Sequence, residues 1–158
     1  MPIRELLAVT PLFEGLTSEC LAVLGGCCGQ RTFHSDQTIF HEGDPGDTLM
    51  IIASGKVKIA RRLPQSGNNY TLAFLETGAV LGEMGVIDTA PRSATATAVT
   101  ETTVLTLPQT ELTTLLAGPE GSRYLPLVLN LARNLSEKLR RANSVISDIV
   151  LYLHTYRF

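Results

Sequence analysis

The sequence predicts an α+β fold, in which an antiparallel β body follows short N-terminal helices and precedes a long C-terminal helix. From about residue 27 to residue 107, short segments rich in Val, Ile, Thr and Phe alternate with turn residues, as antiparallel strands do. Residues 1–26 and 108–158 instead carry apolar residues at helical spacing. Short strands at such regular intervals indicate a sandwich or a barrel.

The first 26 residues are expected to form short helices. Ile3, Leu6 and Leu7 have the spacing of one helical face. Thr17 is of a type that caps helix N-termini, and the apolar run after it meets a stop signal at Gly25-Gly26. These helices precede the β body.

The C-terminal segment, residues 108–158, is expected to be helical, with a break at residues 118–121. Pro108 suits a first helical turn. Beyond the break, apolar residues alternate spacings of four and three, which is typical of a coiled-coil seam: Leu135, Leu139, Ala142, Ile146, Ile149 and Leu153. The seam predicts a homodimer through residues 135–153. The alternative is that this stripe packs on the β body of its own chain.

Composition indicates one domain, residues 1–158, with a single core. Hydrophobic residues make up 44% and charged residues 18%, which is ordinary for a globular protein. A net charge of −2 gives no electrostatic footprint for nucleic acid, so we expect no direct DNA binding. No stretch approaches the roughly 18 apolar residues of a membrane span, and the N-terminus lacks a signal-peptide core, so we expect a cytoplasmic protein without membrane association.

The three cysteines, Cys20, Cys27 and Cys28, are an odd number, which fits a reducing compartment. Adjacent cysteines rarely share a disulfide, and three thiolates lack a fourth metal ligand nearby. We therefore expect the cysteines to pack in the core. The sequence also shows no nucleophile paired with a base and no metal-ligand constellation, so we predict no catalytic residues, no metal and no enzymatic activity.

The segment most informative about function is residues 82–96, GEMGVIDTAPRSATA, which places an acid and a base around a short turn of helix. Gly82 and Gly85 could leave backbone N–H groups free for an anion. Arg92 could bind phosphate oxygens with a bidentate fork, and Glu83 could accept hydrogen bonds from a sugar hydroxyl. The alternative is a solvated salt bridge between Glu83 and Arg92 across a loop.

Two blocks of sequence resemble the cyclic nucleotide-binding domain family, which includes catabolite activator proteins and the regulatory subunits of cAMP-dependent kinases. Gly82-Glu83-Met84-Gly85 followed by Pro91-Arg92-Ser93-Ala94 is similar to the family's phosphate-binding cassette. Residues 43–49, GDPGDTL, running on to Lys56-Val57, are similar to its other signature, a turn followed by two strands of a sheet. The resemblance implies a jelly-roll body at residues 27–107 that contains the cassette at 82–96.

The resemblance also implies roles for individual residues. Arg92 and the amides of residues 82–85 would hold a cyclic phosphate, Ser93 would add a hydrogen bond to it, and Glu83 would hold the ribose hydroxyl. Asn143 falls, with Ala142, where relatives place hydroxyl residues that touch the base, and only Asn143 offers a donor and an acceptor. The expected binding residues are Gly82, Glu83, Met84, Gly85, Arg92, Ser93, Ile59, Leu72, Ala73, Leu75 and Asn143.

The resemblance predicts a regulatory sensor of a cyclic nucleotide, with cAMP favoured over cGMP because Ser93 stands where cGMP-preferring relatives commonly have threonine. Occupancy would be relayed through the C-terminal helix or the dimer interface to an effector protein that the sequence does not identify. No helix-turn-helix follows the long helix, so we expect a stand-alone sensor or the sensory part of a longer transcription regulator. The alternative is a dimeric interaction protein of the same fold with a lost or different ligand.

Overall fold

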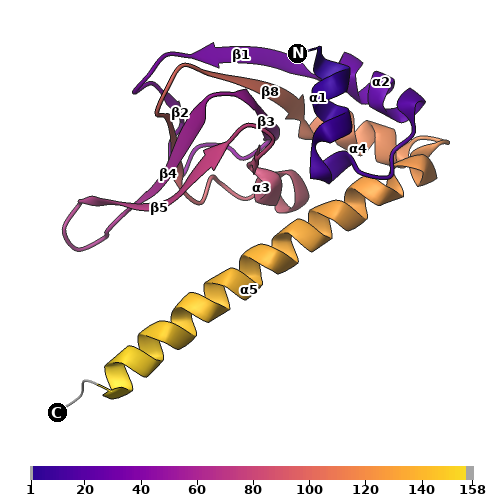
Figure 1. Ribbon diagram of the computed structural model, residues 1–158. Coiled ribbons are helices and arrows are strands. Elements are labelled where there is room, and N and C mark those ends of the chain that lie inside the picture. Colours follow the sequence, from indigo (N-terminus) through magenta and orange to yellow (C-terminus); the bar gives the residue numbers. More distant parts are fainter. Residues whose placement is uncertain (1, 156–158) are drawn as a thin grey trace.

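The computed structural model describes residues 2–155 and shows a β-roll with helices at one end and a long helix leading away from it (Figure 1). The strands form two antiparallel four-stranded sheets, ordered β1-β8-β3-β6 and β2-β7-β4-β5. Their bounds are β1 Gly29–Phe33, β2 Thr38–Phe40, β3 Thr48–Ser54, β4 Lys56–Arg62, β5 Asn69–Glu76, β6 Val80–Leu81, β7 Thr95–Ala98 and β8 Thr102–Pro108. The expected antiparallel roll is confirmed.

Strand β3 explains how the roll is packed, because its apolar run is buried on both faces. Met50 and Ile52 belong to the cluster between the two sheets, whereas Leu49 and Ile51 belong to a second cluster beneath the helices. A strand covered on both sides reads as a continuous apolar run, because neither face alternates with polar residues. The sheet that contains β3 therefore lies between the other sheet and the helical layer.

Short helices form that layer. They are α1 Ile3–Val9, η1 Pro11–Phe13, α2 Ser18–Cys27, α4 Gln109–Ala117 and η2 Gly121–Tyr124, where η marks a 3-10 turn. Thr17 caps α2 as expected, since its hydroxyl accepts a hydrogen bond from the Cys20 amide at 3.3 Å. Helix α2 runs on to Cys27 rather than stopping at Gly25-Gly26, because Gly25 lies within the helix where α1 packs close to it. The three cysteines pack in or against the helical cluster, as predicted.

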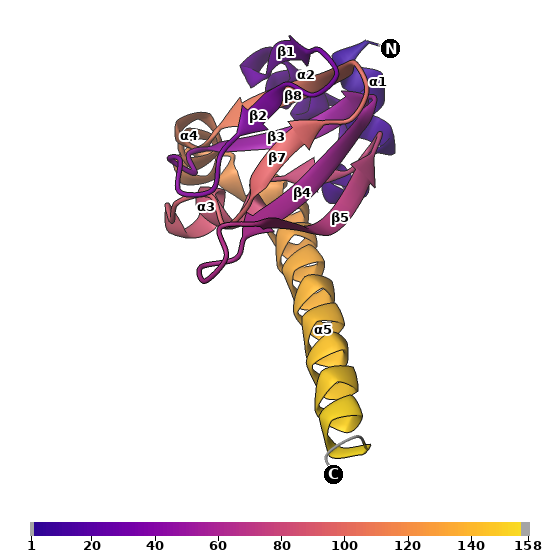
Figure 2. The ribbon, with the colours of Figure 1, turned by 90° about the vertical axis from the view of Figure 1, so that its left-hand side faces the viewer.

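Helix α5, Leu125–Thr155, is 31 residues long, or about 46 Å at 1.5 Å per residue. Its first turns bury Leu127 and Leu131, and the Asn130 amide donates to the carbonyl oxygens of Leu12 and Glu14 at 3.1 and 2.8 Å. After these contacts the helix leaves the β-roll and extends into open space (Figures 1 and 2). A short helix, α3 Glu83–Asp88, lies between the roll and α5.

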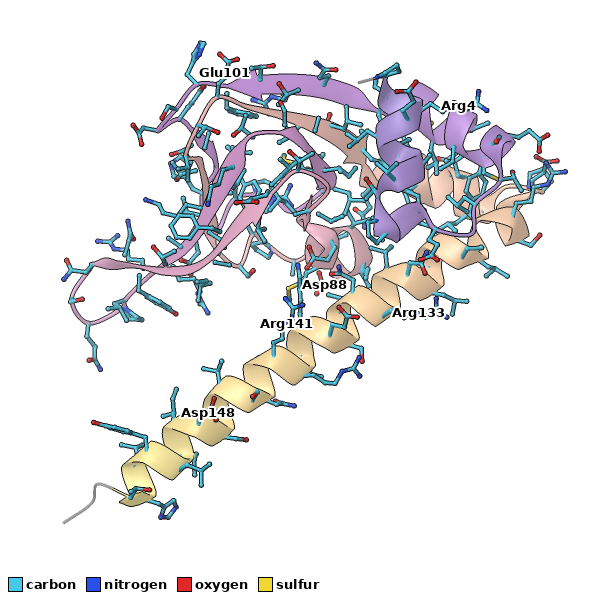
Figure 3. The ribbon with its side chains drawn as sticks, viewed as in Figure 1. Arg4, Asp88, Glu101, Arg133, Arg141 and Asp148 are labelled. Atoms are coloured by element: carbon cyan, nitrogen blue, oxygen red, sulfur yellow. The ribbon has the colours of Figure 1, made fainter. Side chains whose placement is uncertain are left out.

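The seam of α5 does not pack on its own chain. Leu139, Ile146, Ile149 and Leu153 are each more than half exposed. Figure 3 shows Asp148 on the part of α5 that extends away from the roll, with side chains projecting on all sides. The alternative that the stripe covers the β body is therefore wrong for these positions. Within residues 2–155, no helix has both the length and the apolar composition to cross a membrane.

Candidate functional site

The two sequence blocks meet in space at a contact between glycine backbones. A Cβ atom on Gly46 would overlap the carbonyl oxygen of Ala90, and one on Gly85 would overlap the carbonyl oxygen of Gly46. Gly82, which precedes α3, has a φ of 74°, and a Cβ there would overlap Nη1 of Arg92. Glycine at these positions lets the turn after β2 press against α3 and leaves room for the arginine.

Arg92 is only 6% exposed, although it carries a charge. Its Nη2 donates to the Thr48 carbonyl oxygen at 2.8 Å, and its Cζ lies 4.5 Å from the centroid of the Phe40 ring. The Nε and Nη1 atoms are buried and have no hydrogen-bond partner among residues 2–155. Burial lowers the pKa of Arg92, and the charges of Asp47, Asp44 and Glu83 oppose that shift, so the guanidinium remains charged. Two donor positions of a buried cation are thus unused.

Glu83, the first residue of α3, is 4% exposed and pairs with Lys138 of α5. The Lys138 Nζ lies 2.5 Å from the Glu83 Oε1. The proposed surface salt bridge between Glu83 and Arg92 is therefore wrong, because both side chains are buried and the acid pairs with a different base. This ion pair also connects the cassette to the helix that leaves the β-roll.

A hollow that is open to solvent lies between these groups. Eight of the predicted residues line it: Ile59, Leu75, Gly82, Glu83, Met84, Gly85, Arg92 and Ser93. Phe40 and Lys138 line it too. The structure therefore brings most of the predicted set together around one cavity.

Three predicted residues do not line this hollow: Leu72, Ala73 and Asn143. Strand β5 has a bulge, since Ile59 pairs with Ala73 and Ala60 pairs with Thr71, and Leu72 between them is 51% exposed. Asn143 lies on the part of α5 that has left the roll, about 7.5 Å farther along the helix than Lys138. A bulge changes which side chains of a strand face the hollow, and the direction of a helix decides whether its side chains reach the hollow. Residue spacing in the sequence predicts neither the bulge nor the direction of α5.

Phe40 was not predicted, because nothing in the sequence marks a phenylalanine at the end of a strand as a partner of an arginine far along the chain. Strand pairing makes the contact, since Phe40 pairs with Ala96 of β7, just after the segment that carries Arg92. From the sequence alone, Lys138 on the C-terminal helix could either reach the pocket or be solvated, and the structure places it in the pocket.

The chemistry of the hollow follows from its walls. Arg92 supplies unused N–H donors for an anion, and Glu83 supplies a buried acceptor whose present partner reaches in from a separate helix. Ile59, Leu75 and Phe40 add apolar surface. Among residues 2–155, no group of three or more His, Cys, Asp or Glu side chains is arranged to hold a metal. The site is suited to a small ligand with an anionic end, a hydroxyl and an apolar face.

Comparison with known families matches residues 30–118 to the cyclic nucleotide-binding domain. The chain is 35% identical to a CRP-like cAMP-activated global transcriptional regulator of Mycobacterium tuberculosis over 147 residues, which are 92% of this chain and 62% of that protein. It is 38% identical to a cyclic AMP receptor protein of Thermus thermophilus over 135 residues, 85% of this chain and 59% of that one.

Among solved structures, the catabolite activator protein of Thermus thermophilus superposes with a TM-score of 0.78 at 34% identity, covering 89% of this chain and 63% of that one. The chain thus spans about 60% of the length of the curated relatives it matches. The matched residues, 30–118, include both glycine blocks and every lining residue named above except Lys138.

Proposed function

The chain belongs to the cyclic nucleotide-binding domain family, and on that premise we propose that it is a sensor that binds cAMP beside α3 and relays occupancy through α5. The observation that carries this proposal is the buried guanidinium of Arg92 with two unpartnered nitrogens. Residues 1–158 would act as one sensory domain, made of N-terminal helices (1–26), the β-roll (27–107) and C-terminal helices (108–158).

Arg92 would bind the cyclic phosphate. Leaving a buried polar donor unpaired costs about 1–3 kcal/mol, and more when the group is charged. Phosphate oxygens that accept from Nε or Nη1 would reduce that cost through charge-assisted hydrogen bonds. Ser93 and the amides of Gly82 to Gly85 would add donors around the same phosphate, since these residues line the hollow with Arg92.

Glu83 would accept a hydrogen bond from the ribose hydroxyl, and this is where binding would reach α5. The Glu83 carboxylate is held by Lys138. A sugar hydroxyl arriving at the same carboxylate changes what Lys138 can contact, and a ligand shifts a conformational equilibrium through such differential contacts. The position of α5 would thereby depend on occupancy.

Two features favour cAMP over cGMP. The named relatives from Mycobacterium tuberculosis and Thermus thermophilus are described as cAMP-activated and as a cyclic AMP receptor. Position 93 is serine rather than threonine. We still expect Asn143 to contact the base. It would reach the ligand either after a movement of α5 or by entering the hollow of a neighbouring chain. cGMP is the alternative ligand.

The exposed seam of α5 supports a homodimer through residues 135–153. Apolar residues repeating at four and three along a free helix match the pattern by which two helices pair. The curated relatives extend beyond the matched region, so this domain would serve as the sensory part of a regulator or act on a separate effector protein in the cytoplasm, without binding DNA itself. The alternative is an interaction protein of the same fold that has lost its ligand and functions through its dimer.

Thermal unfolding with cAMP and cGMP, followed by calorimetric titration, tests the proposal. A ligand at 100 times its dissociation constant stabilises a protein by about 2.7 kcal/mol, which gives a clear rise in melting temperature. We expect that rise with cAMP and a smaller one with the same concentration of cGMP. Adenosine, which lacks the phosphate, is the matched control and should give none. No shift with either cyclic nucleotide would favour the alternative of a lost or different ligand.

A further inference from the structure

We propose that Phe40 is a positioning residue for ligand binding: its ring holds the guanidinium of Arg92 through a cation–π contact, so that Nε and Nη1 stay free for the ligand. This inference rests on the proposed function, in which Arg92 binds the phosphate. Phe40 would act through the arginine and not mainly through the ligand. The Arg92 Cζ lies 4.5 Å from the ring centroid, within the roughly 6 Å over which such contacts are favourable.

Three other contacts fix the arginine around that ring. Its backbone N–H donates to the Asp44 carbonyl oxygen at 2.8 Å, and its carbonyl oxygen accepts from the Gly43 amide at 2.9 Å. The side chain is anchored at one nitrogen only, where Nη2 donates to the Thr48 carbonyl oxygen. The ring therefore supplies the remaining restraint on the plane of the guanidinium.

The acids near Arg92 are engaged elsewhere. Asp44 accepts the His41 amide at 2.8 Å, Asp47 accepts the Thr48 hydroxyl at 3.0 Å, and Glu83 is paired with Lys138. Within residues 2–155, none of these carboxylates forms an ion pair with Arg92, although their charges favour its cationic form. The positive charge of Arg92 is thus balanced by nearby carboxylates that do not accept its N–H groups.

An aromatic face suits this task better than a carboxylate would. A carboxylate would restrain a guanidinium by accepting its N–H groups, and those groups would then be lost to the ligand. A ring face attracts the cation through its quadrupole and consumes no N–H donor. The absence of a Cβ on Gly82 keeps the Nη1 side clear. The arginine is thereby restrained while N–H donors at Nε and Nη1 stay available, which lowers the ordering cost of binding.

Fluorination of Phe40 tests the inference without changing the shape of the core. Full-length protein carrying phenylalanine, 4-fluoro- or 3,4,5-trifluorophenylalanine at position 40 would be titrated with cAMP. Fluorine withdraws charge from the ring face, so affinity should fall stepwise, by roughly 2- to 30-fold for the trifluoro ring. Phe40→Leu should weaken binding to a similar extent and Phe40→Tyr should retain it. Phe74→Leu, which removes an exposed ring contact with Lys56 outside the hollow, is the control.

A double-mutant cycle separates positioning from direct contact with the ligand. If Phe40 acts through the arginine, Phe40→Leu should have little further effect on cAMP affinity in an Arg92→Gln background. Equal effects of Phe40→Leu in both backgrounds, or equal affinity across the fluorinated series, would overturn the proposal.

A second readout needs no ligand. In ¹H–¹⁵N spectra of the unliganded protein, the Arg92 Nε–H signal should carry a ring-current shift that Phe40→Leu removes. If the wild type bound no cyclic nucleotide, the proposed function would fail, and this signal would still decide whether the ring holds the guanidinium. An Arg92 signal that Phe40→Leu leaves unmoved would refute the contact itself.

Discussion

Replacing Arg92 by alanine should separate ligand binding from fold stability, because this residue serves the ligand more than the fold. The guanidinium makes one hydrogen bond, to Thr48, and one ring contact, with Phe40, while Nε and Nη1 have no partner within residues 2–155. Losing the hydrogen bond costs about 1.5–3 kcal/mol because the donor is charged. Removing a poorly paired buried charge also removes its desolvation penalty, which stabilises the fold by several kcal/mol. The two effects offset, so we expect the free energy of unfolding to change little.

Binding should respond very differently. A phosphate that loses its buried charged partner is expected to lose about 2–5 kcal/mol of binding free energy. At 1.4 kcal/mol per factor of ten, the cAMP affinity of Arg92→Ala should fall by roughly thirtyfold to several thousandfold. Arg92→Lys keeps the charge but not the planar set of guanidinium donors, so its cAMP affinity should lie between those of the alanine variant and the wild type.

Isothermal titration calorimetry with cAMP measures the affinity, and urea unfolding of the unliganded proteins measures the stability. Arg4→Ala removes an exposed arginine on α1, remote from the cassette (Figure 3), and should leave affinity unchanged. Unchanged cAMP affinity in Arg92→Ala would refute the site assignment. A large loss of stability without ligand would instead show that the buried guanidinium is needed for the fold.

Three further predictions concern the cassette, the seam and the thiols. Gly82→Ala should lower the free energy of unfolding by at least about 1–2 kcal/mol and also weaken cAMP binding, because it combines a positive φ with an overlap on Arg92. Ile146→Asp should dissociate the predicted dimer, as measured by analytical ultracentrifugation, because it places a charge in the seam. Burial, together with the neighbouring Cys27, raises the pKa of Cys28 to about 11, so its alkylation should be slow at pH 8 and accelerate about tenfold per pH unit towards that value. The same shift should lower stability as the pH rises from about 9 to about 11, because the unfolded state releases the proton first.

The predictions for Gly82, for Ile146 and for the alkylation of Cys28 each have a matched control. Gly78 has a φ of 86° with open space around its missing Cβ, so Gly78→Ala should cost stability and leave cAMP affinity intact. Ser147→Asp adds a charge beside the seam and should not dissociate the dimer; equal sedimentation of both variants would argue against the seam. In urea-unfolded protein Cys28 should react at the rate of an ordinary thiol, and equally fast alkylation in the folded state would contradict its burial.

Local chemistry let the sequence predict the elements and the cassette. The Thr17 cap, the antiparallel strands and the terminal helix each follow from residue type and spacing, which act over a few neighbouring positions. Arg92 and Glu83 also form a local pattern, an acid and a base around a glycine-bounded turn, but that pattern fits a solvated salt bridge as well, and the resemblance to the cyclic nucleotide-binding family selected them as site residues.

Only the tertiary structure decided the partners of those residues. Glu83 pairs with Lys138 and Arg92 stacks on Phe40 because helix α5 and strand β2 arrive from distant parts of the chain. The bulge that turns Leu72 outward and the divergence of α5 that takes Asn143 away from the hollow depend on strand register and helix packing, which residue spacing does not encode. The sequence by itself thus determined which elements form and which residues carry charge. The fold determined which charges are buried, which are paired, and that Arg92 keeps two donors free.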